Sequence, residues 1–323
     1  MTNPRLLRTS RELFLSVLSG GSGDLEPWVI DRMTSVVEEE DVEPGKRLFA
    51  EGEQPEFIFF VLEGRIRLER PGSNPWTFEG RSAIGVFDAL LERPHTRTAV
   101  AETNLHLLKL RTEHWLALLE DSFGLARAAL ANSVSTVAAI EERQWATQAQ
   151  PRGSVAVPIS SVDRPLGFIE RVAILAEIPF VRSAGIQVLV ELAESVEELT
   201  FQPGDTLFLR GEPSGGALLV LQGEVVGERN DPALQVLFGP GSFVGGVASL
   251  GNPIAAWQAR AATHVRVLSM RIEDWFDLME EHFDLVRSAL SALALRREAV
   301  LDELAEKSAE LRVDTGSTRR RGD

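Results

Sequence analysis

The sequence predicts an α+β chain, mainly β, built as two tandem β-rolls that are each flanked by N- and C-terminal helices. The first observation is a repeated stretch, which reads VEPGKRLFAEGEQPEFIFFVLEGRI from Val42 and FQPGDTLFLRGEPSGGALLVLQGEV from Phe201. The second is the spacing of its glycines, which recur 159 residues later: Gly45, Gly52 and Gly64 correspond to Gly204, Gly211 and Gly223. The third is a series of short apolar runs between glycines and prolines, which is typical of strands in a roll or barrel. An offset this long indicates a duplicated domain rather than a stacked array of short repeats.

The composition limits the classes of protein that fit. A chain of 323 residues suits two domains with separate cores. It contains no cysteine, which excludes disulfides and thiolate metal sites. Its net charge of −15 argues against a nucleic-acid partner, because such binding relies on basic surface. No apolar run approaches membrane-spanning length and charged residues interrupt residues 1–19, so we expect a cytoplasmic protein that binds neither DNA nor a membrane.

The predicted elements of the first copy follow the order of a roll between helices. Residues 4–40 have helical spacing, with Asp24 as a helix cap, and the acidic run 38–41 is expected at the edge of a sheet. The expected strands are 47–50, 57–62, 65–70, 76–78, 98–101 and 105–110. Apolar residues at helical spacing then predict a short helix around Trp115–Phe123 and a longer one across Leu130–Ile140.

The stretch Gln148–Pro165 separates the two copies. It is rich in proline and serine and lacks a sustained period, so we interpret it as an extended interdomain linker. The second copy repeats the order, with helices over 166–199, a strand-rich block to Met270 and a helix from near Glu273. The predicted organisation is therefore one domain at 1–147, the linker at 148–165, a second domain at 166–312 and a disordered tail at 313–323.

The final helix of the second copy carries an apolar seam that the first copy lacks. The seam residues, at heptad-like spacing, are Val286, Leu290, Leu293, Val300, Leu304 and Leu311. Arg297 and Lys307 interrupt the seam. Two interpretations stay open: the helix lies on its own β-roll, or it associates with a second copy of the chain and makes a homodimer.

The order of helices, β-roll and C-terminal helices, with PG, LF, EGE and FVLEGR in the first copy, resembles the cyclic nucleotide-binding domain family. This is the module of the catabolite activator protein and of the regulatory subunits of cyclic-AMP-dependent kinase. The resemblance covers about residues 10–145 and 166–305, and it implies a double-stranded β-helix for each copy. In that family a phenylalanine-glycine-glutamate sequence is followed by an arginine. The arginine pairs with the cyclic phosphate, and the glutamate accepts a hydrogen bond from the ribose hydroxyl.

The first cassette, IGVFDALLERPHTRTAVAET, departs from this family pattern at both polar positions. Gly85 fills the glycine position, but Val86 replaces the glutamate. His95 stands where the family has arginine, and Arg97 follows two residues later, next to Thr98. On extended backbone, His95 and Arg97 share a face, so these five residues are the candidate ligand-binding residues of the first domain.

Three interpretations of the first pocket stay open. In the first, Arg97 and His95 bind the phosphate while Asp88 or a water molecule meets the ribose. In the second, Arg97 is a surface strand residue that pairs with Glu92 or Glu102. In the third, the pocket is lined for a different and less polar ligand.

The second cassette, VGGVASLGNPIAAWQARAAT, lacks both polar residues of the family pattern. Gly245 fills the glycine position, Gly246 replaces the glutamate and Ala255 occupies the arginine position. The next cation along the chain is Arg260. A buried phosphate without a cationic partner loses several kcal/mol of affinity, so we expect no cyclic nucleotide in the second domain.

The sequence shows no motif of another chemistry. The five histidines do not form the pair that metal-binding β-rolls use, and no serine-histidine-acid, phosphate-loop or metalloprotease pattern occurs. No helix-turn-helix follows the final helix, which argues against DNA reading. We therefore expect no enzyme activity, no metal and no cofactor, apart from a possible cyclic nucleotide ligand in the first domain.

The predicted function is that of a non-catalytic regulatory or adaptor protein in signal transduction, with tandem cyclic nucleotide-binding-type domains that act through protein–protein contacts. Two alternatives stay open. One is a cyclic AMP or cyclic GMP sensor that works through the first domain only, with Arg97 essential. The other is a self-assembling structural protein that uses the seam at 286–311.

Overall fold

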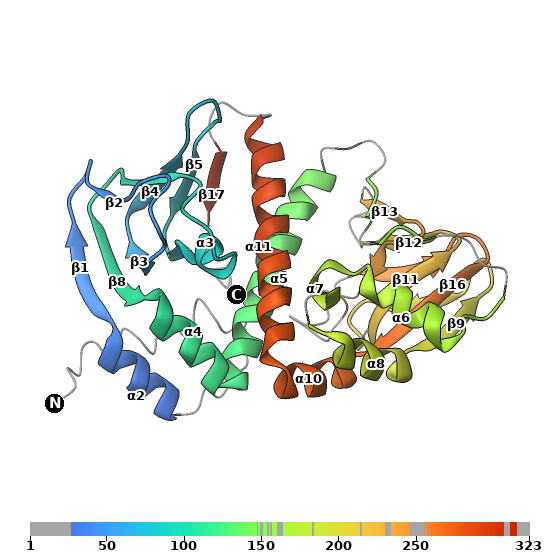
Figure 1. The fold of residues 1–323 in the computed structure, drawn as a ribbon. Coiled ribbons are helices and arrows are strands. Elements are labelled where there is room, and N and C mark those ends of the chain that lie inside the picture. Colours follow the sequence, from blue (N-terminus) through green and yellow to red (C-terminus); the bar gives the residue numbers. More distant parts are fainter. Residues whose placement is uncertain are drawn as a thin grey trace. The chain divides into compact units, whose positions relative to one another are not determined.

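The chain folds into two compact units. Figure 1 shows the computed structural model, which describes residues 27–146, 148, 151–153, 155, 157–159, 164–182, 184–213, 215–229, 234–245, 255, 257–306 and 311–314. The first unit comprises the chain up to Asn132 together with the segment from Ala294 onward, and the second comprises Ser133–Leu293. The predicted domain boundaries after residues 147, 165 and 312 rest on the sequence repeat and stay a prediction.

The first unit is a β-roll of two sheets with helices before and after it. Its elements are α2 (Pro27–Val36), β1 (Glu38–Val42), β2 (Arg47–Phe49), β3 (Phe57–Glu63), β4 (Arg65–Glu69), β5 (Trp76–Glu79), β6 (Ser82–Ile84), α3 (Val86–Leu90), β7 (Thr98–Ala101), β8 (Leu105–Arg111), α4 (Thr112–Asp121), the start of α5 (Phe123–Trp145), the end of α11 (Phe283–Glu306) and β17 (Leu311–Asp314). The strand orders are β1-β8-β3-β6 and β17-β5-β4-β7-β2. The acidic run 38–41 lies in the edge strand β1, which confirms its predicted place.

Strand β3 shows how side-chain alternation builds the core of the first unit. Phe60 packs edge-on against Trp115 of α4, with ring centroids 5.7 Å apart. Its neighbour Phe59 contacts Phe49 of β2, with ring centroids 6.1 Å apart. Successive residues of a strand point to opposite faces. The strand therefore packs one face against a helix and the other against the second sheet of the roll.

The backbone conformation at Gly64 explains why a glycine recurs at this position in both copies. It joins β3 to β4 with φ of 104°, and a Cβ at this position would lie 2.3 Å from the carbonyl oxygen of Asn104. Its counterpart Gly223 has φ of 86°, and a Cβ there would lie 2.2 Å from the carbonyl oxygen of His264. The repeated glycine therefore marks a corner where the backbone leaves no room for a side chain.

Replacing Gly64 with alanine is expected to destabilise the first unit by about 2–4 kcal/mol, because the new Cβ meets a backbone oxygen in a left-handed conformation. Gly72 is the matched control: its φ is 77°, but a Cβ there would have nothing within 4 Å. The Gly72→Ala variant is expected to lose only about 1 kcal/mol. Urea unfolding of both variants measures the difference, and equal losses would show that the close approach at Gly64 is tolerated.

The second unit repeats the order of elements. It contains the end of α5, then α6 (Phe168–Ala176), α7 (Pro179–Arg182), α8 (Ile186–Ser195), β9 (Glu197–Phe201), β10 (Thr206–Phe208), β11 (Gly216–Gln222), β12 (Val225–Glu228), β13 (Gln235–Phe238), β14 (Phe243–Val244), β15 (Gln258–Ala261), β16 (Val265–Arg271), α10 (Ile272–Glu281) and the start of α11. Its sheets have the orders β14-β11-β16-β9 and β10-β15-β12-β13. Helix α10 begins at Ile272, one residue before the predicted Glu273.

The described part of the predicted linker lies along the second roll. The backbone N–H of Leu237 donates to the carbonyl of Pro151 at 3.0 Å, and that of Gly153 donates to the carbonyl of Leu237 at 2.9 Å. Further on, the N–H of Val157 donates to the carbonyl of Gly241 at 3.1 Å. These residues are therefore fixed to β13 and the turn after it by backbone hydrogen bonds.

The C-terminal segment differs from its prediction. Helix α11 ends at Glu306, so the prediction that the helix continues to Leu311 is wrong. Leu311 instead begins β17, which pairs in parallel with β5 and places Asp314 opposite Glu79. The prediction of a disordered tail is wrong for Val313 and Asp314, which complete this strand, and residues 315–323 lie outside the described part of the chain.

The apolar seam of α11 is used inside the chain. The buried seam residues are Val286, Leu290, Leu293 and Val300, and Leu304 is half-buried. The self-associating interpretation requires these side chains on the surface. This conformation therefore does not offer the helical seam to a second copy of the chain.

Helix α5 corrects the prediction about membrane-spanning length. It is long and apolar enough to cross a membrane by length and composition, so the prediction that no apolar segment approaches this length is wrong. Its buried residues include Leu125, Ala126, Leu130, Val134 and Ile140. Apolar side chains at this helical spacing are typical of a helix that packs in a protein core.

Candidate functional site

The first cassette lies between β6 and β7, at the short helix α3. Gly85 precedes the helix in a left-handed conformation with φ of 88°. A Cβ at Gly85 would lie 3.1 Å from the carbonyl oxygen of Phe57 and 3.6 Å from Cε1 of His95, so the glycine lets the loop approach both. Val86 begins α3 and is half-buried, with no polar group to meet a sugar hydroxyl. The glycine of the cassette therefore serves the turn and the packing.

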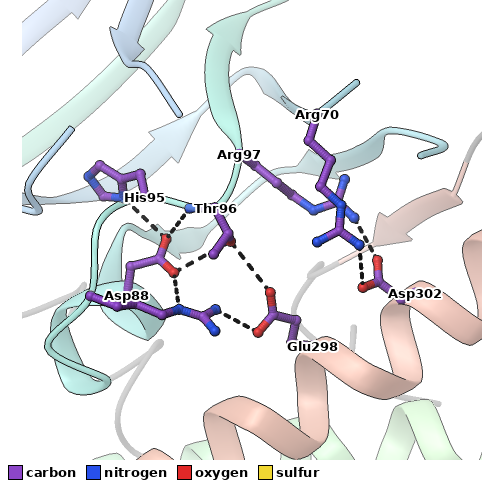
Figure 2. Close-up of polar contacts among 8 residues, drawn as sticks. Arg70, Asp88, His95, Thr96, Arg97, Glu298 and Asp302 are labelled. Carbon is purple, nitrogen blue, oxygen red and sulfur yellow. Dashed lines mark hydrogen bonds and ion pairs between the residues drawn. The ribbon is translucent and has the colours of Figure 1, made fainter. Parts of the chain in front are cut away.

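His95 is held in place by an aromatic ring and a carboxylate. Its side chain is buried and stacks on Phe49, with ring centroids 3.6 Å apart. Its Nδ1 lies 3.2 Å from a carboxylate oxygen of Asp88. Figure 2 shows this contact as a dashed line. The histidine at the expected arginine position therefore has a partner within its own cassette.

Arg97 is buried, and its guanidinium group forms an ion pair with a carboxylate of helix α11. Its side chain is 3% exposed, and the guanidinium lies 3.7 Å from the ring centre of Trp76. One guanidinium nitrogen is 2.5 Å from Oδ1 of Asp302 in α11, and Arg70 donates to the other oxygen of Asp302 at 2.9 Å (Figure 2). Burial lowers the pKa of Arg97 below its ordinary value, and Asp302 opposes this shift. Arg97 is therefore not the surface residue that the second interpretation describes.

A second group of hydrogen bonds and ion pairs connects the cassette to α11. Arg93 donates to Asp88 at 2.9 Å and to Glu298 of α11 at 2.6 Å. The hydroxyl of Thr96 lies 3.5 Å from Asp88 and 3.4 Å from Glu298. Burial alone would raise the pKa of Asp88, but the hydrogen bonds from His95 and Arg93 outweigh it and hold this pKa below its ordinary value. Asp88 is therefore engaged inside the cassette as an ionised carboxylate.

Arg297 of α11 also reaches the cassette region. Its guanidinium lies 4.7 Å from the ring centre of Phe87 in α3 and 5.8 Å from that of Phe78 in β5. Burial lowers the pKa of Arg297 to about 10. The helix thus contributes two acids and one arginine to the first roll, and all three lie on the segment from Ala294 onward that belongs to the first unit.

Thr98 makes a local structural contact. Its hydroxyl accepts a hydrogen bond from the backbone N–H of Glu51 at 3.1 Å. This bond joins the start of β7 to the loop between β2 and β3. The threonine that follows the candidate arginine therefore supports the loop geometry.

An open cleft of about 520 Å³ lies beside the cassette, with His95 in its lining. The residues that line it include Lys46, Phe49, Phe57, Phe59, His95 and Lys109. Among the described residues, neither Arg97 nor Val86 lines this cleft. This cleft and the buried arginine of the cassette therefore do not coincide.

The second cassette has no polar side chain at its glycine and arginine positions. Gly245 has φ of 75°, and a Cβ there would lie 3.2 Å from the ring of Phe208. Ala255 is buried in a core cluster with Phe208 and Val244. Arg260 donates to Glu228 at 3.0 Å on the exposed surface. Gly246 lies outside the described residues.

Backbone hydrogen bonds place Ala255 and His95 at equivalent positions. The N–H of Gly52 donates to the carbonyl of His95 at 2.8 Å, and the N–H of Gly211 donates to the carbonyl of Ala255 at 2.9 Å. In return, the N–H groups of His95 and Ala255 each donate to the residue after that glycine, at 2.8 Å. These hydrogen bonds confirm the alignment of the two cassettes that was made by counting residues along the sequence.

Two acids and a histidine in the second unit have the donor types of a metal site. Glu191 of α8, Glu281 at the end of α10 and His282 each offer one ligand atom, and these atoms lie within 4.8 Å of one another. Carboxylate oxygens and imidazole nitrogens suit several divalent cations. The group could not be recognised from the sequence, because Glu191 is far from the other two residues along the chain.

The acids that pair with the arginines of the first cassette were not among the predicted site residues. Glu298 and Asp302 lie about two hundred residues after the arginines that they pair with. The available signal was their spacing, because residues four apart lie on the same face of a helix. Nothing in the sequence places that face against the first roll.

A family model of the cyclic nucleotide-binding domain matches the chain twice, at residues 39–122 and 198–282. The cyclic nucleotide-gated potassium channel mll3241 of Mesorhizobium japonicum is 29% identical over 108 residues, which is 33% of this chain and 30% of the channel. The match therefore spans less than a third of the channel's length.

Two solved structures resemble the chain along most of its length. The structure of cAMP-bound PfPKA-R is 15% identical, with a TM-score of 0.39, and the match covers 94% of this chain and 93% of that chain. The regulatory subunit of a cAMP-independent protein kinase A from Trypanosoma brucei is 16% identical, with a TM-score of 0.37 and coverage of 95% of each chain.

Proposed function

Because the chain belongs to the cyclic nucleotide-binding domain family, we propose that it is a non-catalytic regulatory protein of the cytoplasm that acts through contacts with other proteins. Cyclic nucleotide binding of the usual kind is not part of this function. The observation that carries the proposal is the pairing of buried Arg97 with Asp302. The cation that would meet a cyclic phosphate already has an anionic partner from the chain itself.

The other polar positions of the first cassette support the same conclusion. His95 has Asp88 as its partner, and Val86 offers no acceptor for a ribose hydroxyl. A nucleotide entering here would have to displace Asp302 and would leave that carboxylate without its buried partner. Burying or stranding charged groups is costly, which disfavours this exchange.

The second cassette supports the proposal through its apolar lining. Ala255 packs among apolar side chains of the core at the position that corresponds to His95. Among the described residues that pack around Ala255, a cyclic phosphate would meet no cation, and burial of an unpaired charge is strongly unfavourable. The two rolls therefore keep the family fold without the polar groups that bind the family's usual ligand.

Calorimetric titration of the full chain with cyclic AMP and cyclic GMP tests this proposal. We expect no saturable heat, which corresponds to a Kd weaker than about 1 mM. The Arg97→Ala variant is the matched control and should give the same flat titration. Micromolar binding by the parent chain would contradict the proposal.

A sensor that uses only the first domain is the second candidate, because the first cassette, unlike the second, contains an arginine whose guanidinium holds a carboxylate and could hold a phosphate instead. In this case the cyclic phosphate replaces Asp302 at Arg97 and releases α11, so the ligand must bind the released state more tightly. Micromolar binding in the calorimetric titration that is lost in the Arg97→Ala variant would select this function. Binding that survives the substitution would exclude it.

A further inference from the structure

The first roll has a surface of three arginines that is covered by an acidic helix. The arginines are Arg70, just after β4, and Arg93 and Arg97 in the segment between α3 and β7; we name them the arginine surface. The covering segment, which we name the strap, comprises the part of α11 from Ala294 to Glu306 and strand β17 (Leu311–Asp314). Surface and strap both belong to the first unit, and Figure 2 shows their contacts.

The strap meets the arginine surface through two acids on one side of α11. Glu298 accepts from Arg93 at 2.6 Å, and Asp302 accepts from Arg97 at 2.5 Å and from Arg70 at 2.9 Å. Residues four apart lie one above the other on a helix. The arginines therefore meet an acid-x-x-x-acid pattern on one side of the helix.

The strap also has an apolar side and a strand. Val300, Leu301 and Ala305 of α11 are buried. The side chain of Asn74 donates to the carbonyl of Ala305 at 2.8 Å near the end of the helix, and β17 extends the sheet beside β5. The occupant that this surface fits is thus an amphipathic helix with two acids one turn apart.

The three arginines of the arginine surface differ in the energetic cost of losing their carboxylate partner. The side chains of Arg70 and Arg93 are 31% and 30% exposed, so salt and water screen their pairs. The side chain of Arg97 is 3% exposed, and a buried guanidinium without a partner is strongly unfavourable. The strap can therefore leave readily only when another carboxylate takes its place at Arg97.

We propose that the arginine surface is a docking site for an acidic amphipathic helix of a partner protein, and that the strap occupies this site until the partner replaces it. The proposal rests on the proposed function, because it names the protein contact through which the chain acts. The partner helix presents two carboxylates four residues apart and apolar side chains on the adjoining face. Exchange of one acidic helix for another keeps Arg97 paired throughout and frees the strap.

The probe is a fluorescein-labelled peptide with the chain's own sequence from Ala294 to Asp314, added to full-length protein. In the parent the strap competes with it, whereas full-length protein with Glu298→Ala and Asp302→Ala has a weakened strap and intact arginines. Fluorescence anisotropy is expected to show that the peptide binds this variant about tenfold or more tightly than the parent. A control variant, Glu306→Ala, removes an exposed acid from the same helix and should behave as the parent.

Several results would overturn the docking proposal. These are equal peptide affinity for the parent and the weakened-strap variant, no binding to the folded variant, or equal binding by a peptide that carries the same two alanines. Binding of inorganic phosphate by the variant without binding of the peptide would assign the surface to small anions and would also overturn it. Cyclic nucleotide binding in the calorimetric titration would instead refute the proposed function, so the two failures are distinguishable.

A second measurement covers the case in which the weakened-strap variant does not fold. Hydrogen exchange is followed in the folded parent with and without excess unlabelled peptide. Because the peptide displaces the strap, exchange of the amides at 294–306 is expected to accelerate about tenfold or more. Unchanged exchange at saturating peptide would overturn the proposal.

Discussion

Replacing Asp302 with alanine is expected to lower the free energy of unfolding of the first unit by about 2–4 kcal/mol. The reason is that Arg97 stays buried but loses the carboxylate that pairs with it. The contact of Asp302 with Arg70 adds little, because that arginine is partly exposed. Urea unfolding measures the loss, and Glu306→Ala is the control, since it removes the same charge from an exposed position at the end of α11.

The double replacement Arg97→Met with Asp302→Leu separates the cost of a stranded charge from the cost of lost packing. Apolar side chains of similar size leave no buried charge, so most of the lost stability should return. The Glu306→Ala control is expected to change the free energy of unfolding by less than about 0.5 kcal/mol. If Asp302→Ala is as mild as this control, the carboxylate does not stabilise the buried arginine.

Replacing Asp88 with asparagine is expected to destabilise the first unit by about 2–3 kcal/mol at neutral pH. Asp88 is buried and accepts from Arg93 at 2.9 Å, and it lies 3.2 Å from Nδ1 of His95. A neutral amide has one acceptor oxygen and no charge to offer these groups. Urea unfolding of the two proteins checks the loss.

The same variant should change how stability depends on pH. The folded-state pKa of Asp88 is held below its ordinary value of 3.8, so its contribution is fully present above that value and disappears as pH falls through the lowered pKa. Glu298, Arg93 and His95 surround it in both proteins. The pKa of Glu198 in the second unit is also lowered, against the effect of burial, by the N–H of Leu166 and by Arg266, and it titrates in the same way in both. Below about pH 4 the parent should therefore lose stability more steeply than Asp88→Asn; parallel curves would contradict the assigned role.

The fold could be predicted from the sequence because it depends on local backbone requirements that occur twice. Gly64 and Gly223 are needed where a Cβ would meet a carbonyl oxygen, and such positions leave a glycine in each copy. The register of the cassettes follows in the same way, since His95 and Ala255 make equivalent backbone hydrogen bonds. These features are local, so spacing along the sequence was sufficient to find them.

The partner of Arg97 could not be predicted, because it depends on where a distant helix packs. The repeat assigns α11 to the second copy, whereas its segment from Ala294 onward belongs to the first unit. The spacing of apolar residues along α11 predicted the apolar seam. It did not indicate which of the two rolls the acidic side of the helix would contact. The predicted end of the helix was wrong for a related reason. Leu311 pairs through its backbone with β5, which is more than two hundred residues away along the chain.

A double-mutant cycle between Arg97 and Asp302 tests most directly whether the helix carboxylate satisfies the buried arginine of the first cassette. The free energy of unfolding is measured for the parent, Arg97→Met, Asp302→Leu and the double variant. The pairing seen here predicts a coupling energy of about 2 kcal/mol or more. A coupling energy within about 0.3 kcal/mol of zero would mean that the two side chains act independently, and would contradict the account.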